Sequence, residues 1–409
     1  MKNSKETVEL RVGKLIVGNG TVREDTRIGI VNGRILEISD KPLTHTYENV
    51  EDVMNRIVMP GLIDAHVHLV YSGRPQDIDI RDRSHEYLTL RAAELSRKAL
   101  KAGVTTLADA GGRGNTIFAL RNAIKDGITL GPRIRACGSM ITITGGRATH
   151  GFRVRGGYEV DGADEARKKT RELLMYYGAD LIKLGATGAL SSPHTGARDP
   201  QLTVTEMQAA VEEAHKCGRP VHAHCYGPKG ISNALDANVD VIVHGQTLNK
   251  THIKDMKQLN TILIPTLTVF RRNERVKELA TKGEAARPIS SESITEQTEM
   301  NVRNAIRHGI PIAMGTDSGM THTYFGDNLL DLVYMVDWGM QESEAIVAGT
   351  LTAAKALRID DQVGSIETGK LADLLILKQD PLKDIKVLTE PETIQRIMLN
   401  GRFIEHLLI

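Results

Sequence analysis

Histidine pairs, a lysine and an aspartate lie at the ends of short apolar runs along the chain. Residues two apart in an extended strand point to the same side, so His66 and His68 can reach one ion together. Imidazole and carboxylate groups are ligands of Zn²⁺ and neighbouring divalent metals. Because no cysteine is needed, the pattern predicts a catalytic rather than a structural metal site. The residues that carry it are His66, His68, Lys183, His222, His224, His244 and Asp317.

Each of these features alone also has a structural explanation. With 14 His in 409 residues, chance accounts for an isolated His-x-His pair. A lysine in a core strand is rarer, because burying an ammonium group is costly unless it is paired or neutralised. Asp317, within Gly-Thr-Asp-Ser-Gly, suits a helix cap or a turn. Their joint occurrence at the ends of several apolar runs favours a metal site.

The middle of the chain alternates short apolar runs with amphipathic stretches. Apolar strands that alternate with helices predict a parallel sheet covered on both faces. Eight such units favour an α/β fold of the closed (β/α)8 TIM barrel type, with an open α/β sheet as the alternative. In a barrel the C-terminal strand ends meet at one mouth, which brings the chemical groups together. The runs lie at 55–69, 104–110, 132–140, 179–186, 219–225, 239–245, 261–267 and 310–317.

The two ends of the chain have a different pattern. Both read as short strands with alternating polarity, and Asn32-Gly33 is a tight-turn signal between two of them. We therefore expect both ends to build one minor sheet domain. The expected division is a small β-sandwich domain from residues 1–57 plus 360–409, beside a barrel from residues 58–359.

Composition and charge restrict the class of partner. The chain has 52 basic and 51 acidic residues, so it lacks the broad basic field that holds nucleic acid or an anionic membrane. No apolar run approaches the roughly 20 residues that span a bilayer, and the first residues lack the apolar core of a secretory signal. Three cysteines are too few for a disulfide framework. We expect a cytoplasmic protein that acts on a small molecule. A dehydrogenase is disfavoured, because no GxGxxG follows the first strand.

The motifs around these residues resemble the amidohydrolase superfamily, in its two-metal form with a carboxylated lysine. They are MPGLIDAHVHL, the lysine of GADLIKLGATG, VHAHCYG, VIVHG, MGTDSG and VGSIETGKLADLLIL. Within the superfamily, GADLIKLGATG and EEAHKCGRPVHAHCYG are most similar to prolidase-like and Xaa-Arg carboxypeptidase-like members, and imidazolonepropionase-related members are close in pattern. The resemblance implies a hydrolase of amide C–N bonds and, since relatives often form homo-oligomers, a homo-oligomer.

The resemblance also implies two divalent metal ions, with zinc as the expected metal. A free lysine, whose pKa is about 10.4, is a poor ligand beside two dications. A carbamate formed from Lys183 and CO₂ would instead offer two anionic oxygens. His222 points the same way as His224 but lies deeper in its strand, so we expect it in the barrel interior. The implied ligands are His66, His68 and Asp317 for the inner ion, His224 and His244 for the outer ion, and Lys183 for both.

A mechanism and a substrate contact follow from the same resemblance. A metal-bridging hydroxide would attack the amide carbonyl, and Asp317 would pass the proton of the water to the leaving amine. In peptidase-like relatives a tyrosine at the place of Tyr226 helps to hold the substrate carboxylate. Relatives commonly carry a histidine after the paired glycines of the third loop, where this chain has Arg147 and, further on, His150. An arginine can bind a carboxylate bidentately; a solvated basic loop is the alternative.

Three functions stay open at this point. The first is hydrolysis of a dipeptide or an N-acyl amino acid, as in carboxypeptidases and prolidases. The second is hydrolysis of a cyclic amide, urea or carbamate, as in imidazolonepropionase-like members. The third is a non-catalytic scaffold that kept the barrel and lost the metals, and the complete set of ligand residues argues against it.

Overall fold

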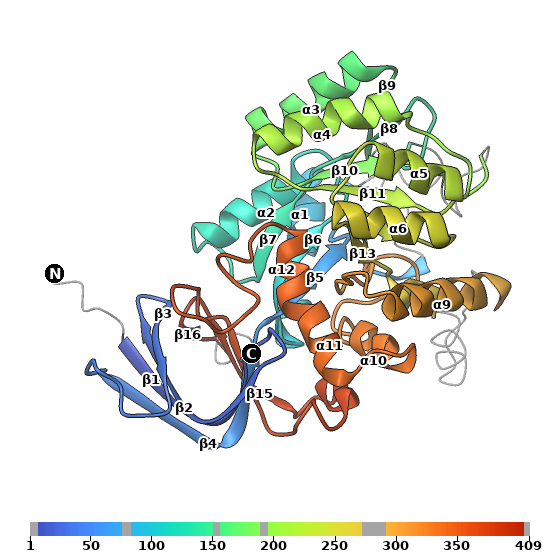
Figure 1. Ribbon diagram of the computed structural model, residues 1–409. Coiled ribbons are helices and arrows are strands. Elements are labelled where there is room, and N and C mark those ends of the chain that lie inside the picture. Colours follow the sequence, from blue (N-terminus) through green and yellow to red (C-terminus); the bar gives the residue numbers. More distant parts are fainter. Residues whose placement is uncertain (1–6, 76–82, 150–155, 189–194, 272–291, 405–409) are drawn as a thin grey trace.

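The computed structural model describes residues 7–75, 83–149, 156–188, 195–271 and 292–404. Helices surround two sets of parallel strands, and a third sheet lies beside them (Figure 1). The chain therefore has the predicted α/β class, with its parallel strands covered by helices. Within these described ranges no helix is both long and apolar enough to cross a membrane.

The third sheet is built from both ends of the chain. Its seven strands run in the order β16-β15-β14-β4-β1-β2-β3. The β2–β3 turn places Asn32 at φ +50° and Gly33 at φ +79°, the left-handed conformations that a tight Asn-Gly turn requires. The two ends thus pair in one sheet, whereas the sandwich form and the domain boundaries stay predictions. The strands are β1 (Thr7–Ile16), β2 (Val22–Val31), β3 (Arg34–Ser39), β4 (Asn49–Pro60), β14 (Leu374–Leu377), β15 (Ile394–Leu399) and β16 (Arg402–Phe403).

The parallel strands form one sheet of three and one of six. The first has the order β5-β6-β7 and the second β13-β12-β11-β10-β8-β9, and every pair within them is parallel. This confirms the predicted parallel pairing. The strands are β5 (Leu62–Val67), β6 (Val104–Asp109), β7 (Arg133–Ala136), β8 (Met140–Ile143), β9 (Gly157–Val160), β10 (Ile182–Gly185), β11 (Val221–Cys225), β12 (Val241–His244) and β13 (Ile262–Ile264).

Helices connect these strands and bury their apolar faces on them. Helix α3 ends at Tyr177, and the following Gly178 adopts φ +61°, as expected of a glycine that closes a helix before the next strand. The helices are α1 (His85–Lys101), α2 (Thr116–Lys125), α3 (Ala163–Tyr177), α4 (Val204–Lys216), α5 (Pro228–Asp236), α6 (Lys250–Leu259), α7 (Leu267–Phe270), α9 (Glu292–Arg307), α10 (Leu330–Asp337), α11 (Glu342–Val347) and α12 (Ala353–Ala356), with a π-helix at Ala348–Thr352 and a 3₁₀ helix at Ile385–Thr389.

Two of the predicted strands are divided between different sheets. The run at 55–69 belongs to β4 as far as Pro60 and continues as β5 after Gly61. Proline has no N–H to donate, and a Cβ on Gly61 would lie 2.2 Å from the Thr105 hydroxyl, so the chain changes sheet here. The run at 132–140 likewise divides into β7 and the start of β8, with Gly138 at φ +73° between them.

The predicted eighth strand at 310–317 is not a regular strand. Its backbone nevertheless bonds to both parallel sheets: Ala313 donates to the carbonyl of Leu263 on β13 (2.9 Å), and Met314 accepts from Ala65 on β5 (3.0 Å). Pro311 lacks an N–H, and Asp317 adopts φ +58°, so the pairing stops at single bridges. Apolar residues from both sheets meet in one buried cluster that includes Ile63, Ala65, Ala108, Val241, Val243, Ile264 and Ala313.

Candidate metal centre

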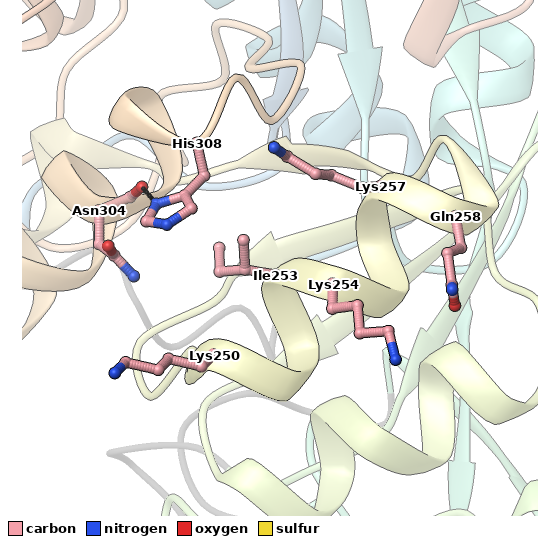
Figure 2. Close-up of a pocket in the computed structure, with 7 residues that line it drawn as sticks. All are labelled: Lys250, Ile253, Lys254, Lys257, Gln258, Asn304 and His308. Atoms are coloured by element: carbon pink, nitrogen blue, oxygen red, sulfur yellow. Dashed lines mark hydrogen bonds between the residues drawn. The ribbon is translucent and has the colours of Figure 1, made fainter.

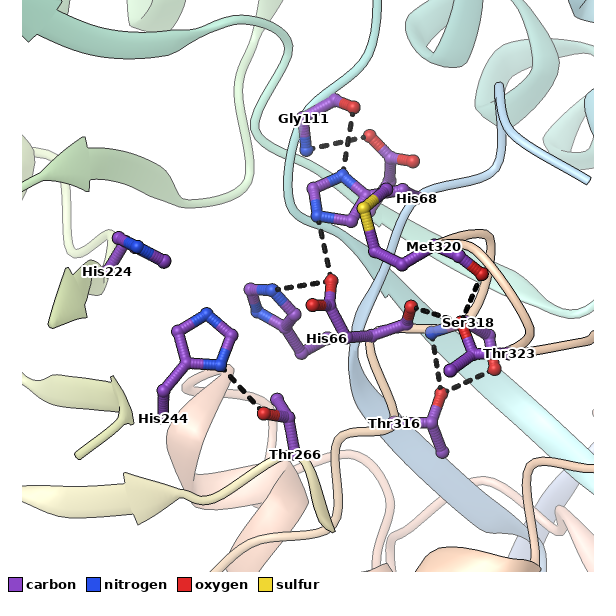
Figure 3. Close-up of polar contacts among 12 residues, drawn as sticks. His66, His68, Gly111, His224, His244, Thr266, Thr316, Ser318, Met320 and Thr323 are labelled. Atoms are coloured by element: carbon purple, nitrogen blue, oxygen red, sulfur yellow. Dashed lines mark hydrogen bonds and ion pairs between the residues drawn. The ribbon is translucent and has the colours of Figure 1, made fainter. Parts of the chain in front are cut away.

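The predicted chemical groups gather at the C-terminal ends of the parallel strands. His66 and His224 lie one residue before the ends of β5 and β11, and His244 ends β12, whereas Lys183 is the second residue of β10. Figure 3 shows His66, His68, His224 and His244 around a common space. All these side chains, and that of Asp317, are at most 5% exposed. The parallel arrangement therefore collects them as the sequence predicts.

Asp317 is the centre of the tightest group. Its Oδ1 lies 3.1 Å from His68 Nε2 and 3.5 Å from His66 Nε2. His66, His244 and Asp317 each offer a ligand atom, and these atoms lie within 4.8 Å of one another. The Nε2 atom of His244 is buried and has no hydrogen-bond partner in the described part of the chain. A divalent cation would satisfy such atoms, because buried polar atoms rarely stay without a partner.

Protonation states favour a cation at this place. Burial lowers the pKa of both His66 and His244 well below the usual histidine value, so these imidazoles are neutral near pH 7. Burial alone would raise the pKa of Asp317, but the hydrogen bonds of His66 and His68 outweigh it, so the pKa lies well below its usual range. Neutral imidazoles beside a carboxylate are the ligand forms that zinc and similar metals require.

Lys183 is completely buried beside this group. Its Nζ has no hydrogen-bond partner among the residues that the structure describes. Burial, followed by the charge of Arg147, lowers the pKa of Lys183 to about 7. A large fraction of the amine is therefore neutral at physiological pH, which is unusual for a lysine.

The second histidine group is more strongly tied to the protein. The rings of His224 and His244 lie 4.5 Å apart, and the Tyr226 ring stacks on His244 at 4.7 Å. However, both ring nitrogens of His224 have contacts: Nδ1 with the Arg147 guanidinium, and Nε2 with the carbonyl oxygen of Gly188 at 2.9 Å. His224 thus lies near the cluster, but both of its nitrogens are already engaged.

Hydrogen bonds from residues outside the cluster fix the imidazole rings of His244 and His68. Thr266 Oγ1 lies 2.7 Å from His244 Nδ1, and the Gly111 carbonyl lies 3.2 Å from His68 Nδ1 (Figure 3). These contacts leave the Nε2 atoms to face the cluster, as second partners of metal-binding histidines commonly do. In addition, His244 and Asp317 have φ values of +71° and +58°. Such backbone conformations cost about 1–3 kcal/mol each and concentrate at functional sites.

The other predicted residues differ in their placement. His222 is buried and its Nε2 lies 2.9 Å from the carbonyl oxygen of Ala356, away from the cluster, in line with the expected interior position. Arg147 and Tyr226 are 7% and 5% exposed and lie against the histidines. His150 lies outside the described residues.

A separate cleft lies on the outer helices, between α6 and the end of α9. Its volume is about 350 Å³, and its lining includes Lys250, Lys254, Lys257, Ile253, Asn304 and His308 (Figure 2). No predicted site residue lines it. The candidate chemistry therefore belongs to the strand ends and not to this surface cleft.

Comparisons with known proteins agree with the geometry. The profile of the amidohydrolase family matches residues 57–404. Ochratoxinase from Aspergillus niger is 28% identical over 95% of this chain and 85% of its own length, and an imidazolonepropionase from Picrophilus torridus is 23% identical over 94% and 93%. The crystal structure of a Xaa-Pro dipeptidase with methionine in its active site is 31% identical, covers 97% of this chain and 99% of its own, and superposes with a TM-score of 0.85.

Proposed function

The chain belongs to the amidohydrolase family and is a hydrolase of C–N bonds, and we propose that its substrates are dipeptides or N-acyl amino acids with a free carboxylate. The observation that carries this proposal is the buried guanidinium of Arg147 beside the Tyr226–His244 stack. A guanidinium and a phenol at the edge of the site can bind a carboxylate together. The similarity to a Xaa-Pro dipeptidase supports the same substrate class.

We further propose that the clustered residues hold two divalent ions, with zinc as the first candidate. Two buried atoms support this, because His244 Nε2 and Lys183 Nζ have no hydrogen-bond partner in the described ranges. The neutral fraction of Lys183 suits reaction with CO₂ to a carbamate, with loss of one proton from the amine. The proposed ligands are His66, His68 and Asp317 for the inner ion, His224 and His244 for the outer ion, and the Lys183 carbamate for both.

His224 can take its proposed role only if one of its two contacts is replaced. Its partners are the Arg147 guanidinium and the Gly188 carbonyl. Replacement of the first contact would release Arg147 toward the mouth, where it could pair with a substrate carboxylate. Ligand binding and substrate binding would then be coupled through one side chain.

Each site residue then has a proposed role in the hydrolysis. Bound metal ions would lower the pKa of water and polarise the amide carbonyl. Asp317, ionised and buried, accepts the proton of the attacking water and delivers it to the leaving amine. Arg147 and Tyr226 orient the substrate through its carboxylate. His150, outside the described residues, is proposed as a further carboxylate contact.

Two proposals concern the framework. We propose that the parallel sheets close into a (β/α)8 barrel; the bonds of residues 311–318 to β13 and β5, and the 2.9 Å bond from Asp180 N–H to the Ala136 carbonyl, support closure. We also propose a small β-sandwich domain of residues 1–57 plus 360–409 beside a barrel of residues 58–359. Pairing of β4 with both β1 and β14 supports one domain from the two ends of the chain, and this pairing continues to Pro60, three residues beyond residue 57.

A second candidate is hydrolysis of a cyclic amide, and the similarity to an imidazolonepropionase over 94% of the chain favours it. A substrate screen separates the two. We expect free-acid dipeptides and N-acyl amino acids to be hydrolysed faster than their C-terminal carboxamides by about tenfold or more, because the amides cannot pair with Arg147. Equal rates for acids and carboxamides, or activity confined to cyclic amides, would contradict the proposal. The release of amine measures each rate.

A further inference from the structure

Asp331 is a fully buried carboxylate near the start of α10, outside the histidine cluster. Its Oδ1 accepts hydrogen bonds from the backbone N–H and the hydroxyl of Thr268, both at 2.9 Å. Its Oδ2 accepts a longer one, of 3.4 Å, from the N–H of Gly315. Three donors from two separate segments therefore converge on one carboxylate.

Each of these segments supports a different member of the cluster. Thr268 lies two residues after Thr266, whose hydroxyl contacts His244 Nδ1. Gly315 lies two residues before Asp317, and the space around Gly315 is tight: an added Cβ would lie 2.4 Å from Ile264 and 2.9 Å from the Cβ of His66. A shift of either segment would therefore move His244 or Asp317 relative to the other.

A second hydrogen bond, from a residue close to Asp331 in the sequence, also supports the segments behind the cluster. Asn328, three residues before Asp331 and just outside α10, donates to Asp64 Oδ2 at 2.8 Å. Asp64 is fully buried and also accepts from the N–H of His66 (3.2 Å) and from the hydroxyl of Thr316 (2.6 Å). Asn328 and Asp331 are thus linked to the backbone on both sides of the Asp317–His66 pair, through Asp64 and directly at Gly315.

We infer that Asp331 is a positioning residue, which fixes the segments behind His244 and Asp317 so that both can bind one metal centre. This inference rests on the proposed function. Both side-chain oxygens of Asp331 accept hydrogen bonds; in an asparagine the amide nitrogen would face a donor from one of the two segments. Partners of this kind typically change metal affinity by about 10–100-fold when they are lost.

The test compares Asp331→Asn with two controls. Asp337→Asn lies on the same helix but removes a partly exposed ion pair to Arg271. Asp240→Asn removes ion pairs at the opposite strand ends, and controls for loss of stability alone. Metal affinity is measured by competition with a chelator, and the unfolding temperature of the metal-free protein is measured beside it. The visible spectrum of the cobalt-loaded form reports the ligand geometry.

We expect Asp331→Asn to weaken metal affinity by about 10-fold or more and to change the cobalt spectrum, while both controls keep the wild-type affinity and spectrum. If Asp331→Asn fails to fold, Thr268→Val, which removes only one of the three hydrogen bonds, should weaken the affinity by a smaller factor. Wild-type affinity and spectrum in the testable variant would overturn the inference, as would an equal loss in Asp240→Asn. A wild-type protein that binds no metal would instead refute the proposed function, and the inference with it.

Discussion

Ionisable side chains just before the parallel strands have charged partners, whereas some in the described part of the candidate metal centre do not. Before β10, Asp180 pairs with Arg121 at 2.7 Å and with Arg135 at 3.0 Å. Arg135 Nε has no hydrogen-bond partner among the described residues, but its Nη1 forms the ion pair to Asp180. Three residues further on, within β10 itself, Lys183 is fully buried and its Nζ has no hydrogen-bond partner within the described ranges.

Strand β12 repeats this contrast. Before it, Asp240 pairs with Arg358 at 2.5 Å and with His215 at 2.8 Å, whereas His244 Nε2 at its far end lacks a hydrogen-bond partner among the described residues. Paired charges before the strands can stabilise the fold by themselves, whereas buried polar atoms without a hydrogen-bond partner favour the binding of a ligand. Changes at the N-terminal ends should therefore alter stability, and changes at the C-terminal ends should alter chemistry.

The largest effect is expected for Asp317→Asn. The amide cannot take up the proton of the water, so turnover should fall by about 10³-fold or more. The variant should still fold because the shape of the side chain is kept, but loss of the ionised carboxylate beside His66 and His68 should lower the unfolding temperature. Steady-state kinetics on a substrate found by the screen, with circular dichroism as the control for folding, measures both. Near-normal turnover would remove Asp317 from the proton-transfer role.

Lys183→Met should lower metal affinity strongly, but it should not lower the stability of the metal-free protein. If Lys183 holds the metal ions as proposed, its loss should lower metal affinity by about 10-fold or more. The metal-free variant should be at least as stable as the metal-free wild type, because methionine replaces an unpartnered buried amine. Metal analysis and thermal unfolding test the two effects. A variant that keeps full metal content would show that Lys183 is not a ligand.

Asp240→Asn tests the opposite strand end. We expect a loss of about 1–3 kcal/mol in unfolding free energy at neutral pH, with activity per folded molecule unchanged. Burial alone would raise the pKa of Asp240, but hydrogen bonds from His215 and the N–H of Val221 lower it below the usual value. This contribution is therefore present above the unfolded pKa of about 3.9 and is lost as the pH falls through the folded pKa.

Denaturant unfolding at several pH values measures the difference between Asp240→Asn and the wild type. The difference should shrink in acid. A difference that grows in acid, or a variant with normal stability and impaired turnover, would break the contrast between the two strand ends.

The smallest effect concerns thiol reactivity beside the cluster. Cys225 follows His224 but is buried, and burial raises its pKa to about 12, whereas Cys217 is exposed. We expect an alkylating reagent to modify Cys217 in the native protein and to spare Cys225, with no loss of activity. Peptide mass spectrometry locates the modification. Rapid alkylation of Cys225 would show that its surroundings at the mouth are more open than the structure indicates.

The sequence could predict those site residues whose positions follow from the periodicity of the strands. His66, His68 and His244 end apolar runs, and parallel pairing alone brings such ends to one side. By contrast, Thr266 and Asp331 could not be predicted, because their contacts depend on how a turn and a helix pack behind the strands. The engagement of His224 by Arg147 also depends on tertiary packing between two loops.

The points at which the chain passes from one sheet to another were harder to predict than the site residues near the C-terminal ends of the strands. The sequence runs through Pro60-Gly61 without a change in apolar character, although the chain leaves one sheet and enters another there. The signal was present in the two residue types, since proline removes a donor and glycine permits close approach. In the same way, Pro311 indicated that residues 311–318 would form only single bridges and not a regular strand.

Metal analysis of the purified wild-type protein tests the central proposal most directly. We expect two divalent ions per chain, loss of amide hydrolysis when a chelator removes them, and recovery when zinc is restored. A protein that retains no divalent metal, or that hydrolyses its substrate equally well after complete metal removal, would contradict the proposed role of the strand ends.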